Sequence, residues 1–292
     1  MTQACGYRKF SSGGIARHSV AKRATRRTVE GLPIEECQRY SRKFNMIRAS
    51  KPQKSLVDRL IASLQQDEFV LYAQSIIPLA PQAGERPFQE IFVRFKEEDA
   101  KLLPPGTFFP VLEECKLLPY LDRWVANRLA RWVRSAVSIK PDWAVPRNNV
   151  NLSEATLSDP GYGQYVCRYV DDSYLSGGAL GFEIALDCAI THEASVQKLM
   201  GEVRPYGCSL TLSGFDGSKA SFSELKDLAP DYIKISSTNV ASADLREITQ
   251  KCQAAGIKTI GEHVESSQML QDLRESRIDF AQGFDVSPVI PL

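Results

Sequence analysis

Charged and polar side chains interrupt several short apolar runs in this sequence of 292 residues. Glu183 lies within the run 180–185, and Lys234 lies within the run 232–235. Because burying an unpaired charge is costly, we expect such groups to converge and to compensate one another. The polar residues in or at the ends of these runs are Gln74, Glu90, Asn151, Glu183, Lys234, Glu262 and Gln282. Carboxylates, amides and an ammonium around one opening favour a site for a phosphate and a divalent cation such as Mg²⁺ or Mn²⁺.

The elements that must position these side chains are short strands alternating with amphipathic helices. Apolar residues recur at helical spacing over 56–64 and 121–137, and further helices are predicted over 196–203, 244–255 and 267–275. The predicted strands are 69–72, 90–93, 149–152, 180–185, 209–212, 232–235, 258–262 and 278–282. Strands that alternate with helices predict parallel pairing. Eight such strands over about 235 residues predict an α/β fold, a (β/α)8 barrel. In such a barrel the polar residues at the strand ends face the mouth. The alternative is an open doubly wound sheet, although no GxGxxG follows the first strand.

The charge is unevenly distributed along the chain. Residues 1–50 carry eleven Lys or Arg and three acidic residues, a formal charge of +8, whereas the remainder has a formal charge of −7. Residues 1–29 contain no acidic residue and are rich in Ser, Gly and Arg, which predicts a disordered tail. Alternatives are a basic tether to nucleic acid, to an anionic membrane or to an acidic partner, an organellar transit peptide, and a wrongly assigned start codon. We therefore divide the chain into a basic N-terminal extension, 1–54, with one helix expected over 33–48, and the barrel, 55–292.

Composition excludes several other classes of protein. No run of about 20 apolar residues is present, so no membrane-spanning helix is expected. The first twenty residues lack the apolar stretch of a secretory signal. The seven cysteines form no CxxC pair, and their odd number fits a reducing compartment better than a disulfide framework. We expect a cytoplasmic location.

Nine short motifs, in order along residues 55–292, resemble those of the EAL domain family, which comprises cyclic di-GMP phosphodiesterases and their inactive relatives. They are LYAQSI at 71–76, EIFVRF at 90–95, FFPVLE at 108–113, VNLS at 150–153, FEIAL at 182–186, LTLSGFD at 210–216, IKIS at 233–236, GEHVE at 261–265 and QGF at 282–284. The resemblance implies a TIM-like barrel of the EAL type.

The metal ligands that the resemblance implies are only partly retained. Glu90, Asn151 and Glu183 match three ligand positions, but the paired aspartates of active members are replaced by Ser213 and Gly214. At two further positions where the family has an acidic residue, this chain has Leu186 and Ser236. Asp216, in the altered loop 213–218, is an alternative ligand. Because two-metal hydrolysis needs cations to activate water, we expect an incomplete metal site.

The residues that would act on or hold the nucleotide are better retained. By resemblance, Glu262 matches the general base and Lys234 matches the lysine that orients the attacking water, but a base without metal-bound water has little to act on. Arg94 matches an arginine that grips a phosphate, and Gln74 and Gln282 match positions near the ligand. The ligand-binding set is Gln74, Glu90, Phe92, Arg94, Asn151, Glu183, Glu262 and Gln282.

Two of these positions carry unusual side chains. Phe92 replaces the EAL leucine and offers either barrel packing or a stacking surface for a base. His263 replaces a glycine beside Glu262, where it either crowds the mouth or contacts a base.

Three functions follow from this pattern. The first is a catalytically inactive receptor that binds cyclic di-GMP without any required cofactor and relays that state to a signalling protein, by family analogy a PilZ-type adaptor, with pili, motility or biofilm as outputs. The second is a scaffold that binds a protein and no nucleotide. The third is a weak phosphodiesterase, and only this function requires Mg²⁺ or Mn²⁺. The resemblance also allows a homodimer.

Overall fold

The structure is a computed structural model that describes residues 51–66, 68–80, 85–96, 102–103, 105–171, 175, 178–215, 219–236 and 242–292. The N-terminal extension, its expected helix over 33–48, and Asp216 therefore lie outside the described residues. None of the helices in the described ranges has the length and apolar composition that crossing a lipid bilayer requires.

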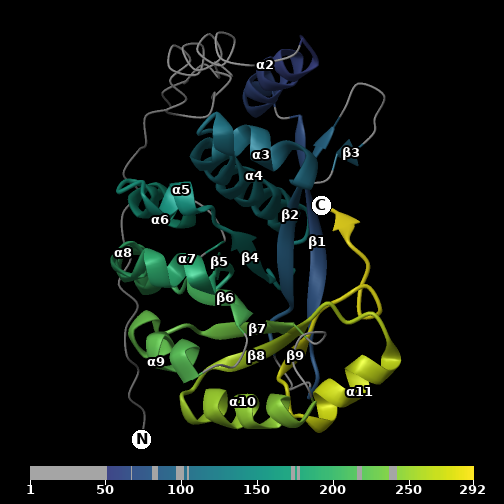
Figure 1. The fold of residues 1–292 in the computed structure, drawn as a ribbon. Coiled ribbons are helices and arrows are strands. Elements are labelled where there is room, and N and C mark those ends of the chain that lie inside the picture. Colours follow the sequence, from purple (N-terminus) through teal and green to yellow (C-terminus); the bar gives the residue numbers. More distant parts are fainter. Residues whose placement is uncertain are drawn as a thin grey trace, which may run out of the picture.

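A closed barrel of strands forms the centre of the molecule (Figure 1). The strands are β1 (Phe69–Pro78), β2 (Phe88–Lys96), β3 (Leu102–Leu103), β4 (Arg147–Asn151), β5 (Leu180–Ala185), β6 (Ser209–Phe215), β7 (Tyr232–Ser236), β8 (Lys258–Glu262), β9 (Phe280–Ala281) and β10 (Ile290–Pro291). In the sheet, β1 is bonded to β2 on one side and to β9 and β10 on the other. The eight strands β1, β2 and β4 to β9 close the barrel, which confirms the predicted fold class.

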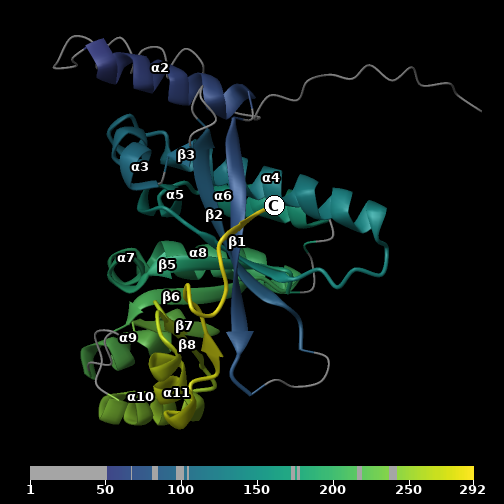
Figure 2. The ribbon, with the colours of Figure 1, turned by 90° about the vertical axis from the view of Figure 1, so that its right-hand side faces the viewer.

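The prediction that all strands are parallel is wrong for β1. This strand pairs antiparallel with β2, β9 and β10, whereas β2 and β4 to β9 pair in parallel. A short connection from Pro78 to Phe88 joins β1 to β2 as a hairpin, which leaves no room for the crossover helix that parallel pairing needs. Both strands continue beyond the barrel as a two-stranded arm (Figure 2).

Helices cover the outside of the barrel. They are α2 (Lys51–Gln66), α3 (Pro105–Glu114), α4 (Leu118–Ile139), α5 (Glu154–Leu157), α6 (Tyr162–Asp171), α7 (Leu186–Thr191), α8 (Glu193–Val203), α9 (Lys219–Leu228), α10 (Ser242–Ala254) and α11 (Ser267–Glu275), with one 3₁₀ turn, η1 (Arg204–Tyr206). The Ser266 hydroxyl caps α11 by accepting from the backbone N–H of Met269 at 3.3 Å. Gly256 follows α10 with a φ of +74°, a conformation that favours glycine and ends the helix. Helix α2 begins at Lys51, so it crosses the boundary that we expected at 54/55.

Two cores hold the site between them. One core packs helices against the strands and includes an aromatic cluster of Phe69, Phe95, Phe108 and Trp124. The second core is a layer of Ile76, Phe88, Tyr232, Ile260 and Phe280. Each residue of this layer stands two positions from one of the predicted polar residues, so both share a strand face. The apolar layer is therefore the floor on which the polar layer rests.

Candidate functional site

Strands β1 and β2 carry a ladder of cross-strand pairs from the barrel core to its mouth. Ile76 pairs with Phe88, Gln74 with Glu90 and Tyr72 with Phe92. Gln74 and Glu90 are in the interior of their strands, so the expectation that they stand at strand ends is wrong. Their strands extend past the mouth as the two-stranded arm, which places the polar pair in mid-strand.

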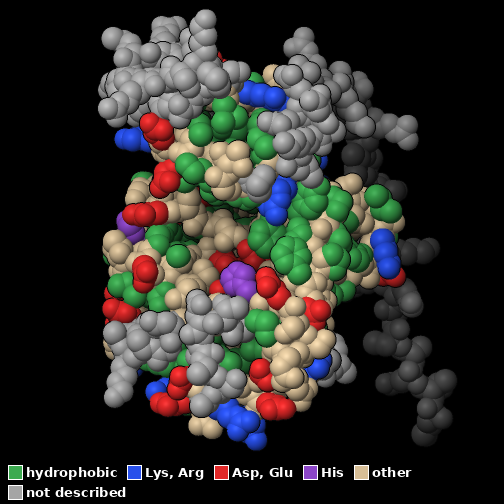
Figure 3. All heavy atoms as spheres, turned by 45° about the vertical axis from the view of Figure 1, so that its right-hand side comes forward, with side chains coloured by type: hydrophobic (Ala, Val, Ile, Leu, Met, Phe, Trp, Pro, Cys, Tyr) green, Lys and Arg blue, Asp and Glu red, His purple; other side chains and the backbone are tan. Residues whose placement is uncertain are grey.

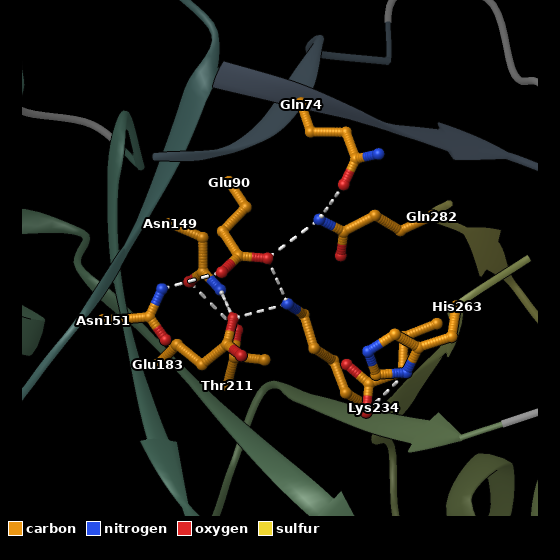
Figure 4. A network of polar contacts seen from close by, with 10 residues as sticks. Gln74, Glu90, Asn149, Asn151, Glu183, Thr211, Lys234, His263 and Gln282 are labelled. Atoms are coloured by element: carbon orange, nitrogen blue, oxygen red, sulfur yellow. Dashed lines mark hydrogen bonds and ion pairs between the residues drawn. The ribbon is translucent and has the colours of Figure 1, made fainter. Parts of the chain in front are cut away.

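An ammonium joins two carboxylates at the centre of this layer (Figure 4). Lys234 Nζ lies 2.6 Å from Glu90 Oε2 and 2.7 Å from Glu183 Oε2. The three side chains are almost fully buried, with exposed fractions of 2%, 7% and 5%. The expectation that buried charges of the separate strands converge is confirmed for this triad. Its formal charge is −1 when both carboxyl groups are ionised.

Amide side chains complete the hydrogen bonding of both carboxylates. Asn151 Nδ2 donates to Glu90 Oε1 at 2.7 Å, and Gln282 Nε2 donates to Glu90 Oε2 at 2.8 Å. The same Gln282 amide donates to Gln74 Oε1 at 3.1 Å, and Gln74 Nε2 donates to the Ser287 carbonyl at 2.9 Å. The retained amides therefore bond to the carboxylates and to one another.

Sequence reasoning missed two members of this network. Asn149 Nδ2 donates to Glu183 Oε2 at 2.7 Å, and its Oδ1 accepts from the Thr211 hydroxyl at 3.2 Å. Both residues are fully buried. Asn149 lies two positions before Asn151, and Thr211 lies two before Ser213, so the two-residue period of a strand was the available signal.

Burial and ion pairing shift the pKa values of the two carboxyl groups in opposite directions. Burial raises the pKa of Glu183 to about 7, against the opposing charge of Lys234. Burial also acts on Glu90, but Lys234 and the hydrogen bonds from Asn151 and Gln282 hold the pKa of that carboxyl below its usual value. The pKa of Lys234 is raised, because Glu183 and Glu90 outweigh its desolvation. The triad therefore favours a charged Lys234–Glu90 pair beside a Glu183 that titrates near neutrality.

Two positions that the resemblance assigns to metal binding supply no carboxylate in this chain. Ser213 is half-buried in β6, and the following Gly214 is exposed with a φ of +78°, so neither position supplies a carboxylate. Lys234 binds the two carboxylates that would face the ion. Within the described part of the chain, no group of three His, Cys, Asp or Glu side chains is placed to hold a metal. Leu186 is buried at the start of α7 and supplies no acidic group at that position.

Arg94 stands above the triad on the same strand face. Its guanidinium lies 5.9 Å from the ring centroid of Tyr72 and 5.7 Å from that of Phe92, and Nη1 donates to the Val93 carbonyl at 3.0 Å. Among the described residues Arg94 has no carboxylate partner. Two aromatic rings thus position a guanidinium that keeps donors for a further anion. Tyr72 was not predicted as a site residue.

A cleft of about 500 Å³ opens beside Glu90, Phe92 and Asn151. Its apolar wall comes from α3, α4, the middle of β2 and the residue after β4. It consists of Ile91, Phe92, Val93, Pro105, Phe109, Leu118, Leu121, Val125 and Leu152. Asp122 lies at its edge, where Oδ2 accepts from the backbone N–H and hydroxyl of Ser153 and from the Thr156 hydroxyl. An apolar cleft with a few fixed polar groups is the usual form of a small-molecule site.

Glu262 and His263 lie on the other side of the mouth. The Glu262 side chain is 16% exposed, and its Oε1 lies 3.9 Å from His263 Nδ1. His263 is 65% exposed and has a φ of +59°, a conformation in which the glycine of the family motif would be unstrained. In Figure 3 a histidine and acidic side chains border a hollow on this face. Figure 4 shows His263 on the side of the polar network where Lys234 lies, and no metal-binding group among the described residues includes it.

Residues 57–288 match the EAL domain family. The chain belongs to this family. The match covers the whole barrel and includes every predicted site residue, so the resemblance inferred from the nine motifs is confirmed.

The curated relatives of this EAL domain are longer proteins. The cyclic di-GMP phosphodiesterase PdeB of Shewanella oneidensis is 26% identical over 242 residues, which span 80% of this chain and 28% of PdeB. The cyclic di-GMP phosphodiesterase NbdA of Pseudomonas aeruginosa is 28% identical over 266 residues, which span 87% of this chain and 33% of NbdA. The chain thus spans about a third of the length of these relatives.

Solved EAL domains have the same fold. The FimX EAL domain of Xanthomonas citri, solved in complex with c-di-GMP, superposes with a TM-score of 0.74 at 24% identity, over 83% of this chain and 96% of that domain. The FimX EAL domain of Pseudomonas aeruginosa, solved bound to c-di-GMP, gives a TM-score of 0.71 at 22% identity, over 80% of this chain and 96% of that domain.

Proposed function

We propose that this EAL domain is a receptor that binds cyclic di-GMP without a metal ion, leaves it intact and relays the bound state to a protein partner. The observation that carries the proposal is the presence of Ser213 and Gly214 on β6, where active relatives have aspartates, beside two retained carboxylates that Lys234 bridges. The ammonium offsets one of the two negative charges that would otherwise attract a cation.

The nucleotide-holding half of the site supports binding. Arg94 is fixed between Tyr72 and Phe92 with donors available to a phosphate, a contact suited to a planar guanidinium. The apolar cleft behind Phe92 has room for a base. The complexes of the FimX EAL domains with c-di-GMP support the same ligand class.

The geometry gives little support to hydrolysis. Glu262 keeps the position of the family's general base and Lys234 that of its water-orienting lysine, but Lys234 is engaged by two carboxylates. A general base needs an activated water within hydrogen-bonding distance. With a cation site that lacks two carboxylates, we infer that turnover is lost while the ligand contacts remain.

A nucleotide-independent scaffold is the second candidate. Phe284 lies two residues from Gln282 at the mouth and is 74% exposed, and exposed large apolar groups beside a polar rim favour protein contacts. In the receptor proposal the same side chain serves the partner once the nucleotide is bound.

The test is a calorimetric titration of cyclic di-GMP into the wild type and into Arg94→Ala. The matched control is Arg59→Ala, since the Arg59 guanidinium stacks on Phe95 at 5.3 Å and lies away from the cleft. The receptor loses affinity by at least about tenfold in Arg94→Ala, in keeping with the strength of a charge-assisted contact, and keeps it in Arg59→Ala. Absence of binding to the wild type supports the scaffold.

A further inference from the structure

The cleft of about 500 Å³ beside Phe92 combines its apolar wall with carboxylates. The acidic residues that line it are Glu90, Glu113, Asp122 and Glu154. Among the described residues, no lysine or arginine lines the cleft. Glu90 is paired with Lys234, and Asp122 accepts three hydrogen bonds from the loop after β4, so these two carboxylates already have partners. The cleft therefore favours an occupant that carries both apolar groups and positive charge.

The carboxylates that can meet such an occupant are those of Glu113 on α3 and Glu154 on α5. Both residues are exposed. Within the described ranges Glu113 is paired with no cation. Glu154 Oε1 lies 3.5 Å from His192 Nε2, which forms an ion pair only when the histidine is protonated, and the Glu154 side chain is 67% exposed. Two glutamates from different elements thus offer negative charge at the edge of an apolar surface.

The cations close to the cleft do not remove this negative charge. Arg123, next to Asp122 in sequence, is paired with Asp159. Lys116 follows α3 but does not line the cleft. Arg94 has no carboxylate partner among the described residues, and its charge offsets the formal charge of −1 of the buried triad. The two exposed glutamates therefore remain in excess.

The chain itself carries a segment of the composition that suits this cleft. Residues 1–50 have a formal charge of +8, whereas the remainder has a formal charge of −7. Within residues 1–29 the aromatic residues are Tyr7 and Phe10, and they flank Arg8 and Lys9. Residues 7–10 therefore offer two rings and two cations, which complement an apolar wall edged by two glutamates.

The N-terminal extension joins the described structure beside the wall of the cleft. Helix α2 begins at Lys51 and packs against α3 and α4, which supply much of the apolar wall. In Figure 2 the purple first turns of α2 lie on the same side of the two-stranded arm as α3. Phe10 lies 41 positions before Lys51. A connection of that length spans at most about 140 Å, which exceeds the width of a domain of this size.

We propose that residues 7–10 of the chain's own N-terminal extension dock in this cleft, with the two rings on the apolar wall and Arg8 and Lys9 beside Glu113 and Glu154. The attraction is between exposed charges, so high salt weakens the contact. The consequence rests on the proposed function: if the cleft takes a base of cyclic di-GMP, the extension and the nucleotide compete for it.

The test is carbodiimide cross-linking of the full chain without nucleotide, followed by mass spectrometry of its peptides. This reagent joins a lysine amine directly to a carboxylate that it contacts. The expected products join Lys9 to Glu113 or to Glu154. An equimolar mixture of ¹⁵N-labelled and unlabelled chains distinguishes a contact within one chain from a contact between two copies, because only the latter gives products of mixed label.

Charge-reversal variants test the recognition. Arg8→Glu and Glu113→Lys should each lower the yield of the Lys9–Glu154 product roughly fivefold, because each replaces an attraction by a repulsion. The matched controls are Arg17→Glu in the extension and Glu114→Lys on α3, an exposed residue that does not line the cleft. Both controls should give the yield of the wild type. Thermal unfolding of each variant verifies the fold.

Titration of cyclic di-GMP separates this proposal from the receptor proposal. If both hold, the nucleotide suppresses the Lys9 products and binds Arg8→Glu roughly fivefold more tightly than Arg17→Glu. Cleft products that form while no nucleotide binds would support docking of the extension and contradict the receptor. Docking is overturned if Lys9 is joined to no residue of the cleft, if the products are of mixed label, or if Arg8→Glu and Arg17→Glu give equal yields, whether or not the nucleotide binds.

Discussion

Lys234 Nζ lies 2.6 Å from Glu90 Oε2, although the two residues are 144 positions apart in sequence. Barrel closure brings β7 and β2 to face each other and places an ammonium between carboxylates that the EAL family uses for cations. The domain therefore carries its own positive charge at the centre of the site. This relationship links the stability, pH dependence and metal response of the protein.

Removing the ammonium should destabilise the fold. Lys234→Met leaves Glu90 and Glu183 buried beside each other without a counter-charge, and breaking a buried ion pair costs about 3–5 kcal/mol. Urea unfolding measures this cost. The triple variant that adds Glu90→Gln and Glu183→Gln should recover most of the loss. If Lys234→Met unfolds at the same urea concentration as the wild type, the ion-pair assignment is wrong.

Stability should fall as the pH rises toward neutrality because of Glu183. Its pKa is raised by burial to about 7 in the folded state, from 4.5 in the unfolded chain. The folded state thus binds more protons between pH 4.5 and pH 7, so this group's contribution to stability decreases with increasing pH in that window. Glu90 acts in the opposite sense, because its lowered pKa gives stability that is lost as the pH falls below 4.5.

Glu183→Gln separates the two effects. The variant should be more stable than the wild type above pH 7, by about 1–2 kcal/mol, and should lose this advantage near pH 5. Unfolding free energies across this pH range provide the measurement. Glu193→Gln on α8, away from the triad, is the control, and an equal pH response in both variants would exclude Glu183 as the titrating group.

Metal ions should leave the wild type unchanged. Ser213 and Gly214 supply no carboxylate, so Mg²⁺ or Mn²⁺ should not shift the melting temperature. Ser213→Asp should gain a shift of about 2–4 °C with Mn²⁺, which corresponds to about 1 kcal/mol in a domain of this size. A positive φ at Gly214 disfavours an aspartate there, so the single variant is the better probe. A shift in the wild type would contradict the metal-free site.

The geometry of Arg94 predicts that a lysine at this position restores only part of the affinity for cyclic di-GMP. Its guanidinium lies against Tyr72 and Phe92, and a lysine offers a point charge without planar donors. Arg94→Lys should bind cyclic di-GMP more weakly than the wild type and more strongly than Arg94→Ala. Equal affinity of wild type and lysine variant in a titration would show that charge alone, without the aromatic clamp, holds the ligand.

The period of the strands explains which features the sequence could predict. Glu90, Glu183 and Lys234 stand inside apolar runs, and their burial cost requires that they meet, as they do. The direction of β1 was missed because strand–helix alternation was extended to the connection between the predicted strands 69–72 and 90–93, although no helix was predicted there. The sequence also did not show that Lys234 pairs with Glu90, because closure of the barrel brings these two residues together.

Uncharged polar residues of the network were also not predicted from the sequence. Asn149 and Thr211 look like unremarkable strand residues, and only the hydrogen bonds to Glu183 identify them. The contact of Tyr72 with Arg94 could not be predicted either, because it depends on the pairing of Tyr72 with Phe92 across β1 and β2. Roles that depend on cross-strand neighbours require the register, which a single sequence does not contain.

The most direct test of the receptor proposal is calorimetric titration of cyclic di-GMP into the full chain in EDTA and then in Mg²⁺, with the nucleotide recovered afterwards. The account predicts equal binding in both conditions, at micromolar affinity or tighter, and intact nucleotide. Binding that appears only with Mg²⁺, or linear product in the recovered sample, would contradict it.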